Sequence, residues 1–205
     1  MKSFFKYIVV AILTWEAKLV LARKKPFIIG ITGNLGKTST KDAVYAVIKS
    51  HVHTRRTEKS MNSEFGVPLT ILGQKSGWNN PMAWMLVVFR GLLVPFQKHY
   101  PTHLVLEVGA DRPNDIKKIA EWLHPDITVV TQFGQVTVHI EFFENRDEVV
   151  KEKGYLVEAL KKDGVFIYNA DDNDAQKLLK KFDGRKVGVG IHEPADIKAD
   201  NVKFY

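Results

Sequence analysis

The 205-residue sequence contains no cysteine, which excludes disulfide bonds and thiolate metal sites. It also lacks an apolar run long enough to cross a bilayer, because Tyr7–Trp15 falls well short of the roughly 20 residues that a spanning helix needs. Internal repeats and low-complexity tracts are absent as well. Apolar residues make up 45% of the chain and charged residues 26%. These values exclude a fibrous or wholly disordered protein and predict one well-buried core.

The formal charge of +7 favours anionic partners, namely nucleotides, nucleic acid or a membrane surface. The basic residues are scattered, apart from Arg23–Lys25 and Lys161–Lys162, so we expect no nucleic-acid partner. No small-x-small cleavage site follows the apolar run near the N-terminus, which argues against a signal peptide. We therefore expect residues 1–25 to form an amphipathic helix. Residues 1–22 would lie on the domain itself or contact the inner surface of the membrane, and the location would be cytoplasmic.

Strand and helix patterns alternate along residues 26–205 and predict one α/β domain. The fold class we expect is a mostly parallel sheet of the P-loop type with helices on both faces, preceded by the amphipathic helix. The expected strands are 27–32, 51–57, 103–108, 127–131, 165–169 and 185–189, with 195–205 as a further candidate. The expected helices are 37–50, 64–72, 82–97, 113–123, 146–160 and 174–182.

The segment Gly30–Thr40 is typical of a phosphate-binding loop, because an apolar strand leads through glycines into a helix that starts with Lys-Thr. Glycines let backbone N–H groups around Gly33 and Gly36 approach an anion, and the helix N-terminus adds partial positive charge. Lys37 would neutralise the terminal phosphates of ATP, and the Thr38 hydroxyl would bind Mg²⁺. The alternative is a glycine-rich turn with an incidental Lys-Thr, since Ile31 replaces one glycine of the general pattern. The expected nucleotide contacts here are Gly33, Asn34, Gly36, Lys37, Thr38 and Ser39.

Glu107 ends the apolar run His103–Val108 with a carboxylate, where a P-loop ATPase needs an acidic metal ligand. Burying an unpaired carboxylate is costly, so a metal ion or a lysine such as Lys37 would have to compensate it. The alternative is a carboxylate exposed at the edge of the strand.

Together these motifs resemble the central domain of the Mur ligases. The phosphate loop is similar to that family's ATP loop, and Asn62–Thr70 resembles the segment that follows it on the substrate side. Glu107–Ala110 resembles the Glu-Met-Gly-Ala of the branch that adds D-alanyl-D-alanine. His139, Lys153 fourteen residues later, and Asn169–Asp172 complete the series in the family's order.

The resemblance implies an ATP-dependent carboxylate–amine ligase that acts through an acyl phosphate in peptidoglycan precursor synthesis. Its partners would be ATP, Mg²⁺ and a carboxylate-bearing cell-wall precursor. Lys37, His139 and Lys153 would be catalytic, and Thr38, Glu107, His139 and a carbamylated Lys153 would bind metal. The resemblance further places Asn169 at the adenine and Asp172 near the nucleotide. Three alternatives come from the residues alone: a structural or surface role for the lone His139, solvated lysines in Lys151–Lys153, and a helix cap formed by the acidic Asp171–Asp174.

Three departures from the family leave other functions open. The family's N-terminal and C-terminal domains have no counterpart in this sequence, and Gln132 stands where the family usually has asparagine. We therefore expect a central domain that is incomplete at its C-terminus, in either a fragment of a longer gene product or a reduced protein, and absent domains that a partner chain could supply. The alternatives are a non-catalytic ATP-binding or scaffold module, and a related ligase of the folylpolyglutamate or cyanophycin synthetase type.

Overall fold

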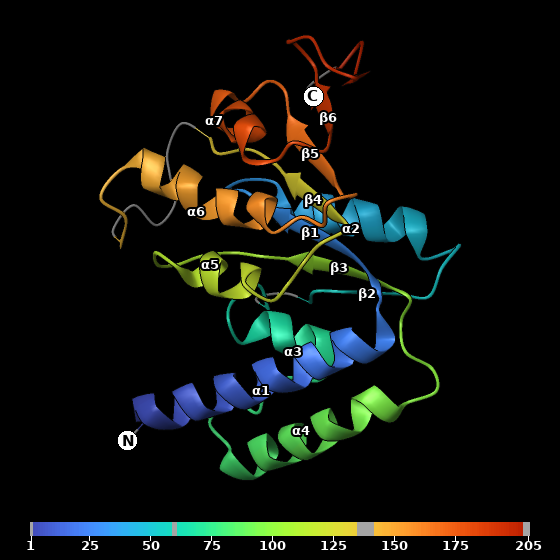
Figure 1. Ribbon diagram of the computed structural model, residues 1–205, viewed down its shortest axis with the longest axis vertical. Helices are drawn as coiled ribbons and strands as arrows, with labels where there is room; N and C mark the ends of the chain where they lie inside the picture. Colours follow the sequence, from blue (N-terminus) through green and yellow to red (C-terminus); the bar gives the residue numbers. More distant parts are fainter. Residues whose placement is uncertain (1, 59–60, 135–141, 203–205) are drawn as a thin grey trace.

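The computed structural model describes residues 2–58, 61–134 and 142–202, in which seven parallel strands form one sheet (Figure 1). The sheet order is β2-β3-β1-β4-β5-β6-β7, and every neighbouring pair is parallel. The predicted fold class, α/β with helices on both faces, is confirmed. The strands are β1 (Phe27–Thr32), β2 (Thr54–Arg56), β3 (His103–Glu107), β4 (Ile127–Val130), β5 (Val165–Asn169), β6 (Arg185–Gly190) and β7 (Ile197–Lys198).

Most of the described helices lie within a few residues of the predicted ranges. Side-chain caps define three of their starts: Asn80 accepts from two backbone N–H groups of α4, Asn145 from one of α6, and Asp172 from two of α7. The helices are α1 (Lys2–Lys24), α2 (Lys37–Ile48), α3 (Gly66–Leu72), α4 (Pro81–Leu93), α5 (Asp115–Ala120), α6 (Arg146–Glu158) and α7 (Asn173–Lys177). Short 3₁₀ turns at Val94–Phe96 and Leu178–Lys181 extend α4 and α7.

The central strands bury both of their faces, as parallel strands do. Ile29, Ile31 and Val105 point to one face, where Val44 and Ile48 of α2 cover them. Alternate residues of the same strands point to the opposite face, into the larger core beneath α3, α5 and α6. One face of the central strands is thus covered by α2, and the opposite face by the larger core and several helices.

An outer helical layer consists of α1, which packs on α3, and α4, which packs on α1 on the side away from the sheet (Figure 1). Val9, Leu13, Ala17 and Val20 of α1 are buried at helical spacing and belong to the larger core. No helix in the described part of the chain is long and apolar enough to cross a membrane.

The sheet has a topological switch point at β1, because the chain continues to β2 and β3 on one side and to β4 on the other. In open parallel sheets ligands bind outside the carboxyl ends of the strands at such a point. The segments that follow β1, β3 and β4 meet there, and they carry the predicted phosphate loop and Glu107.

Candidate functional site

The phosphate loop connects β1 to α2 and leaves the start of α2 open. Gly36 precedes the helix in the left-handed conformation (φ 80°), and no side chain caps the first turn. The first N–H groups of a helix have no partner within it, so they are available to an anion in front of the helix. Gly33 also has a positive φ of 135°, and a Cβ there would collide with the hydroxyl of Thr131. The backbone at Gly33 can therefore be formed only by glycine.

Some backbone N–H groups of the loop are already hydrogen-bonded, so fewer of them can bind phosphate than the sequence predicted. The N–H groups of Asn34 and Leu35 both donate to the Gln132 carbonyl, at 2.8 and 2.9 Å. The Thr131 hydroxyl donates to the Leu35 carbonyl at 2.7 Å. These bonds hold the loop against the end of β4. The donors that remain for phosphate are those at the start of α2, where Thr38 and the exposed Ser39 lie in the first turn.

Lys37 folds back over the loop, since its ammonium donates to the Asn34 carbonyl at 2.9 Å. Burial lowers the pKa of Lys37, and the nearby Glu107 carboxylate opposes this shift. Gly33, Asn34, Lys37 and Lys153 line one small cavity of about 80 Å³. The cavity therefore brings three predicted residues of the phosphate loop together with Lys153, which is distant from them in sequence.

Glu107 is buried at the end of β3, and both of its carboxylate oxygens have polar partners. Its Oε2 accepts from the Thr38 hydroxyl at 3.0 Å, and its Oε1 accepts from the Asn62 side-chain amide at 3.1 Å. The ammonium of the buried Lys41 lies 3.8 Å from Oε2. A lysine compensates this carboxylate, as expected, but the ion pair is formed by Lys41, and Lys37 interacts with Glu107 through its charge at longer range.

Sequence reasoning missed Lys41 and Asn62 as site residues. Lys41 lies one turn beyond Lys37 on α2, and this i,i+4 spacing places both on the same side of the helix. Asn62 opens the Asn62–Thr70 segment that carried part of the resemblance, so that motif held the signal for it.

Lys153 is buried on α6 and faces the same cavity as Lys37. Burial, followed by the repulsion of Lys37, lowers its pKa to about 8. Within residues 2–58, 61–134 and 142–202 no hydrogen bond or ion pair to its ammonium is found. Glu152 beside it is also buried, and accepts from the backbone N–H groups of Asn114 and Ile116 at 2.9 and 2.6 Å. Solvated lysine is therefore not the explanation for Lys153.

The oxygen atoms around Glu107 fit a magnesium ion. Mg²⁺ binds oxygen ligands, usually one or two carboxylates together with phosphates and water. The Thr38 hydroxyl and the Glu107 carboxylate supply two such ligands side by side. The described residues contain no cluster of three or more His, Cys, Asp or Glu side chains that could bind a metal without such additions. His139, the other predicted ligand, lies outside the described residues.

The predicted adenine-side residues lie at the end of β5. The Asn169 side-chain oxygen accepts from the Asp171 N–H at 3.0 Å. Asp172 caps α7 by accepting from the N–H groups of Asp174 and Ala175, at 2.9 and 3.0 Å. Its other oxygen accepts from the Phe133 N–H at 2.8 Å. The helix-cap interpretation of Asp172 is confirmed, and its carboxylate is fully occupied by the backbone.

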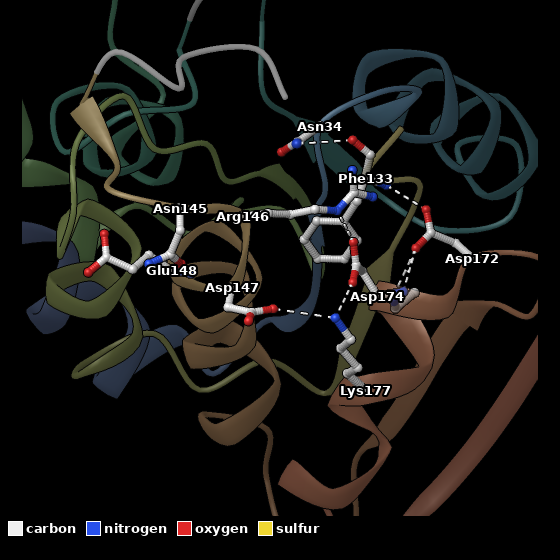
Figure 2. A network of polar contacts seen from close by, with 10 residues as sticks. Asn34, Phe133, Asn145, Arg146, Asp147, Glu148, Asp172, Asp174 and Lys177 are labelled. Atoms are coloured by element: carbon white, nitrogen blue, oxygen red, sulfur yellow. Dashed lines mark hydrogen bonds and ion pairs between the residues drawn. The ribbon is translucent and has the colours of Figure 1, made fainter. Parts of the chain in front are cut away.

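A chain of contacts joins the two ends of the predicted nucleotide site (Figure 2). The Asn34 side-chain amide donates to the Phe133 carbonyl at 3.1 Å, and the Phe133 N–H donates to Asp172. Next to it, Asp174 pairs with Arg146 and with Lys177. Burial acts against the Asp174 carboxylate, but these two cations hold its pKa below the usual range. The phosphate loop, the end of β4 and the starts of α6 and α7 are therefore tied together.

The chain is similar to known proteins of one family. The family model described as the Mur ligase middle domain matches residues 31–205. A Bacillus subtilis UDP-N-acetylmuramoyl-tripeptide–D-alanyl-D-alanine ligase is 29% identical over 176 residues, which cover 86% of this chain and 33% of that protein. The Mycobacterium leprae ligase of the same name is 33% identical over 145 residues, which cover 71% of this chain and 23% of that protein. The chain thus spans about a third or less of the length of these curated relatives.

Solved structures show the same fold. MurF from Acinetobacter baumannii superposes with a TM-score of 0.75 at 19% identity, over 95% of this chain and 37% of that one. MurF ligase from Thermotoga maritima, in complex with ADP, superposes with a TM-score of 0.70 at 26% identity, over 91% of this chain and 38% of that one. Since the family model matches all but the first 30 residues, this chain belongs to the Mur ligase family, in the part that corresponds to its middle domain.

Proposed function

We propose that this chain is the nucleotide-binding part of an ATP-dependent ligase that joins a carboxylate to an amine in peptidoglycan precursor synthesis. One observation carries the proposal: the open start of α2, with Lys37, lies beside the Thr38–Glu107 contact at the switch point of the sheet. Helix amides and a lysine suit a phosphate chain, and adjacent oxygen ligands suit the cation that accompanies it.

The loop residues would act on the phosphates of ATP. Lys37 would release the Asn34 carbonyl and turn its ammonium to the terminal phosphates, while Gly36 and Ser39 would contribute the surrounding amides. Thr38 and Glu107 would hold magnesium, with His139 as a further ligand. The magnesium ions would screen the charge of the phosphates and of the attacking carboxylate. Asn169 would contact the adenine. Asp172 would act indirectly, by holding Phe133 and the loop in place.

Lys153 is proposed as the lysine that becomes carbamylated. Its neutral amine would attack carbon dioxide and lose a proton, which forms a carbamate and changes a cation into an anionic oxygen ligand. Two features support this: a pKa lowered to about 8 provides neutral amine near physiological pH, and the side chain faces the cavity of Lys37.

The chemistry follows from the charges. A substrate carboxylate oxygen would attack the γ-phosphorus as the bond to the bridging oxygen breaks, which yields an acyl phosphate and ADP. The amine would then attack the acyl carbon and release phosphate as the amide forms. The first step brings two anions together, so the cations at the start of α2 would lower its barrier by electrostatic stabilisation.

The proposed branch is the one that adds D-alanyl-D-alanine to the nucleotide-linked tripeptide. The names of the Bacillus subtilis and Mycobacterium leprae relatives support this branch, and the ADP bound to the Thermotoga maritima structure supports the use of ATP. Because the chain corresponds to about a third of the Bacillus subtilis relative, ligation would require the remaining domains on the same or another chain.

Substitution of Lys37 tests the nucleotide site. Lys37→Ala should weaken binding of ATP by roughly a hundredfold or more, because a half-buried cation that would face the phosphates is lost. Lys49→Ala is the matched control, since Lys49 lies at the other end of α2, next to Tyr45, and should leave binding unchanged. Calorimetric titration with ATP and magnesium measures both. Normal ATP binding by Lys37→Ala would refute the loop assignment.

A turnover assay separates ligation from simple nucleotide binding. Phosphate release would be measured with the nucleotide-linked tripeptide and D-alanyl-D-alanine, first with this chain and then with the domains that complete the family's length. ATP binding without stimulated release in the completed protein would favour the non-catalytic module.

A further inference from the structure

The positive charge of this protein is concentrated in two segments that the proposed ligase site does not use. Residues 1–25 and 73–102 contain nine of the 30 Lys and Arg residues but only one of the 23 Asp and Glu residues. The remaining chain contains 21 basic and 22 acidic residues, so it is nearly neutral. The single acid, Glu16, is buried. The outer helical layer and its flanking residues therefore present cations to solvent, whereas their one acidic residue is buried.

The same layer exposes an apolar stripe along α4. The exposed residues recur at a spacing of three or four, on the side of the helix opposite its buried residues Trp84, Val87 and Gly91. Met82, Phe89 and Phe96 are 72%, 61% and 65% exposed, and Trp78 just before the helix is 84% exposed. The full stripe consists of Trp78, Met82, Met85, Leu86, Phe89, Leu92, Leu93 and Phe96. A helix that faces water normally carries polar residues on this side, so an exposed apolar stripe of this size is typical of an interaction surface.

Cations border the stripe on the helix and at its carboxyl end. Arg90 is exposed on α4 itself, and Lys98 is exposed just beyond Phe96. The Arg23 guanidinium lies over the Phe96 ring at 4.8 Å, and the Lys24 ammonium donates to the Gln97 carbonyl. Trp78 at the other end lines an open groove of about 740 Å³ with Lys6, which is paired with Glu64 of the neighbouring segment. Apolar side chains bordered by arginine and lysine match the boundary between lipid headgroups and acyl chains.

We propose that the outer helical layer binds peripherally to an anionic phospholipid bilayer, with the α4 stripe (Trp78–Phe96) inserted at the headgroup boundary. In Figure 1 this stripe belongs to the helix farthest from the sheet, so insertion would leave the carboxyl edge of the sheet free. The charge pattern selects lipid over a second copy of the chain, because two such faces would bring cations against cations. Membrane contact thus depends mainly on α4, whereas the sequence alone placed it in residues 1–22. The proposal is independent of the ligase site.

Vesicle flotation tests this with the full chain. The protein should float with vesicles made of equal parts phosphatidylglycerol and phosphatidylcholine, and should remain unbound with phosphatidylcholine alone. Met85→Glu combined with Phe89→Glu should reduce the bound fraction about tenfold or more, since two charges would enter the apolar boundary. Val47→Glu is the matched control, because Val47 is 68% exposed on α2 and should leave binding unchanged. Circular dichroism checks that each variant is folded.

A second variant tests the electrostatic part without altering the stripe. Arg90→Glu combined with Lys98→Glu should abolish the preference for phosphatidylglycerol, and moderate salt should weaken binding of the unmodified protein. Failure of the folded protein to bind anionic vesicles would overturn the proposal, as would equal binding by the Met85/Phe89 variant. Dimerisation that is lost in that variant, in the absence of vesicle binding, would assign the stripe to a protein interface instead. ATP binding should be unchanged throughout, so this result and that of the ligase proposal can be told apart.

Discussion

Glu107 at the edge of the sheet and Glu16 in the outer helical layer are both buried carboxylates, but their surroundings are opposite. Glu107 contacts a hydroxyl, an amide and an ammonium group. Neither oxygen of Glu16 has a hydrogen-bond partner in the described part of the chain, and the backbone of Gly91 is pressed against it. Burial raises the pKa of Glu16 to about 7. The two oxygens of Glu107 thus both have polar partners, whereas burial without a partner favours the protonated form of Glu16.

Removing the two carboxylates should therefore change the stability of the protein in opposite directions, and the larger change is expected for Glu107. Glu107→Ala should lower the free energy of unfolding by roughly 3 kcal/mol, because Lys41 and Asn62 lose a buried partner. Glu107→Gln keeps the shape and one acceptor, so it should cost less. Urea unfolding at neutral pH measures both. An unchanged stability of Glu107→Ala would mean that Asp42, 3.3 Å from Lys41, compensates that lysine by itself.

Glu16→Gln should stabilise the protein at neutral and higher pH, by roughly 1–3 kcal/mol. The pKa of Glu16 is raised from 4.5 to about 7 in the folded state, so the folded protein binds more protons than the unfolded chain between these values. Stability should consequently fall as the pH rises from about 4.5 to about 7, and then level off. Glutamine mimics the protonated acid and should remove this dependence.

Urea unfolding at several pH values measures the stability of the unmodified protein and of Glu16→Gln. Equal stability near pH 4.5 and a growing advantage of Glu16→Gln up to pH 7 is the expected pattern. A destabilised variant at high pH would mean that the Glu16 carboxylate has found a partner that compensates its charge.

The fold was predictable from the sequence because its patterns are local. Apolar runs followed by helical patterns define β1, β3 and β5, and the parallel arrangement follows from the alternation of strands and helices. The phosphate loop was equally visible, because glycine and Lys-Thr stand next to each other in sequence. Strand β2 was predicted too long, since the chain from His51 to His53 turns before it joins the sheet edge.

The contacts around the site were less predictable, because they join residues distant in sequence. Lys41 and Asn62 converge on Glu107 only after β1 and β3 pair, and the carbonyl of Gln132 takes two loop amides only because β4 lies beside β1. The burial of Lys153 likewise depends on how α6 packs over the sheet. A sequence pattern predicts which side of a helix faces the core. It does not predict which charged residue of another element that side contacts.

The starts of α2, at the candidate site, and of α4, in the outer helical layer, also differ. The smallest expected effect on stability is at the start of α4. Both helices begin after a turn, yet α2 has no side-chain cap, whereas Asn80 accepts from the N–H groups of Met82 and Ala83 at 3.0 and 3.2 Å. Asn80→Ala should lower the free energy of unfolding by about 1 kcal/mol, and Asn80→Ser, which can still cap, by less.

Neither change at Asn80 should alter ATP binding, because the amides of α4 serve only the helix itself. If Asn80→Ala weakened ATP binding as well, the outer layer and the site would be coupled, and the open start of α2 could no longer be treated as an independent binding element. If only stability falls, the two helix starts differ in purpose: a cap satisfies the amides of α4 permanently, and those of α2 are left for an anion that arrives from solution.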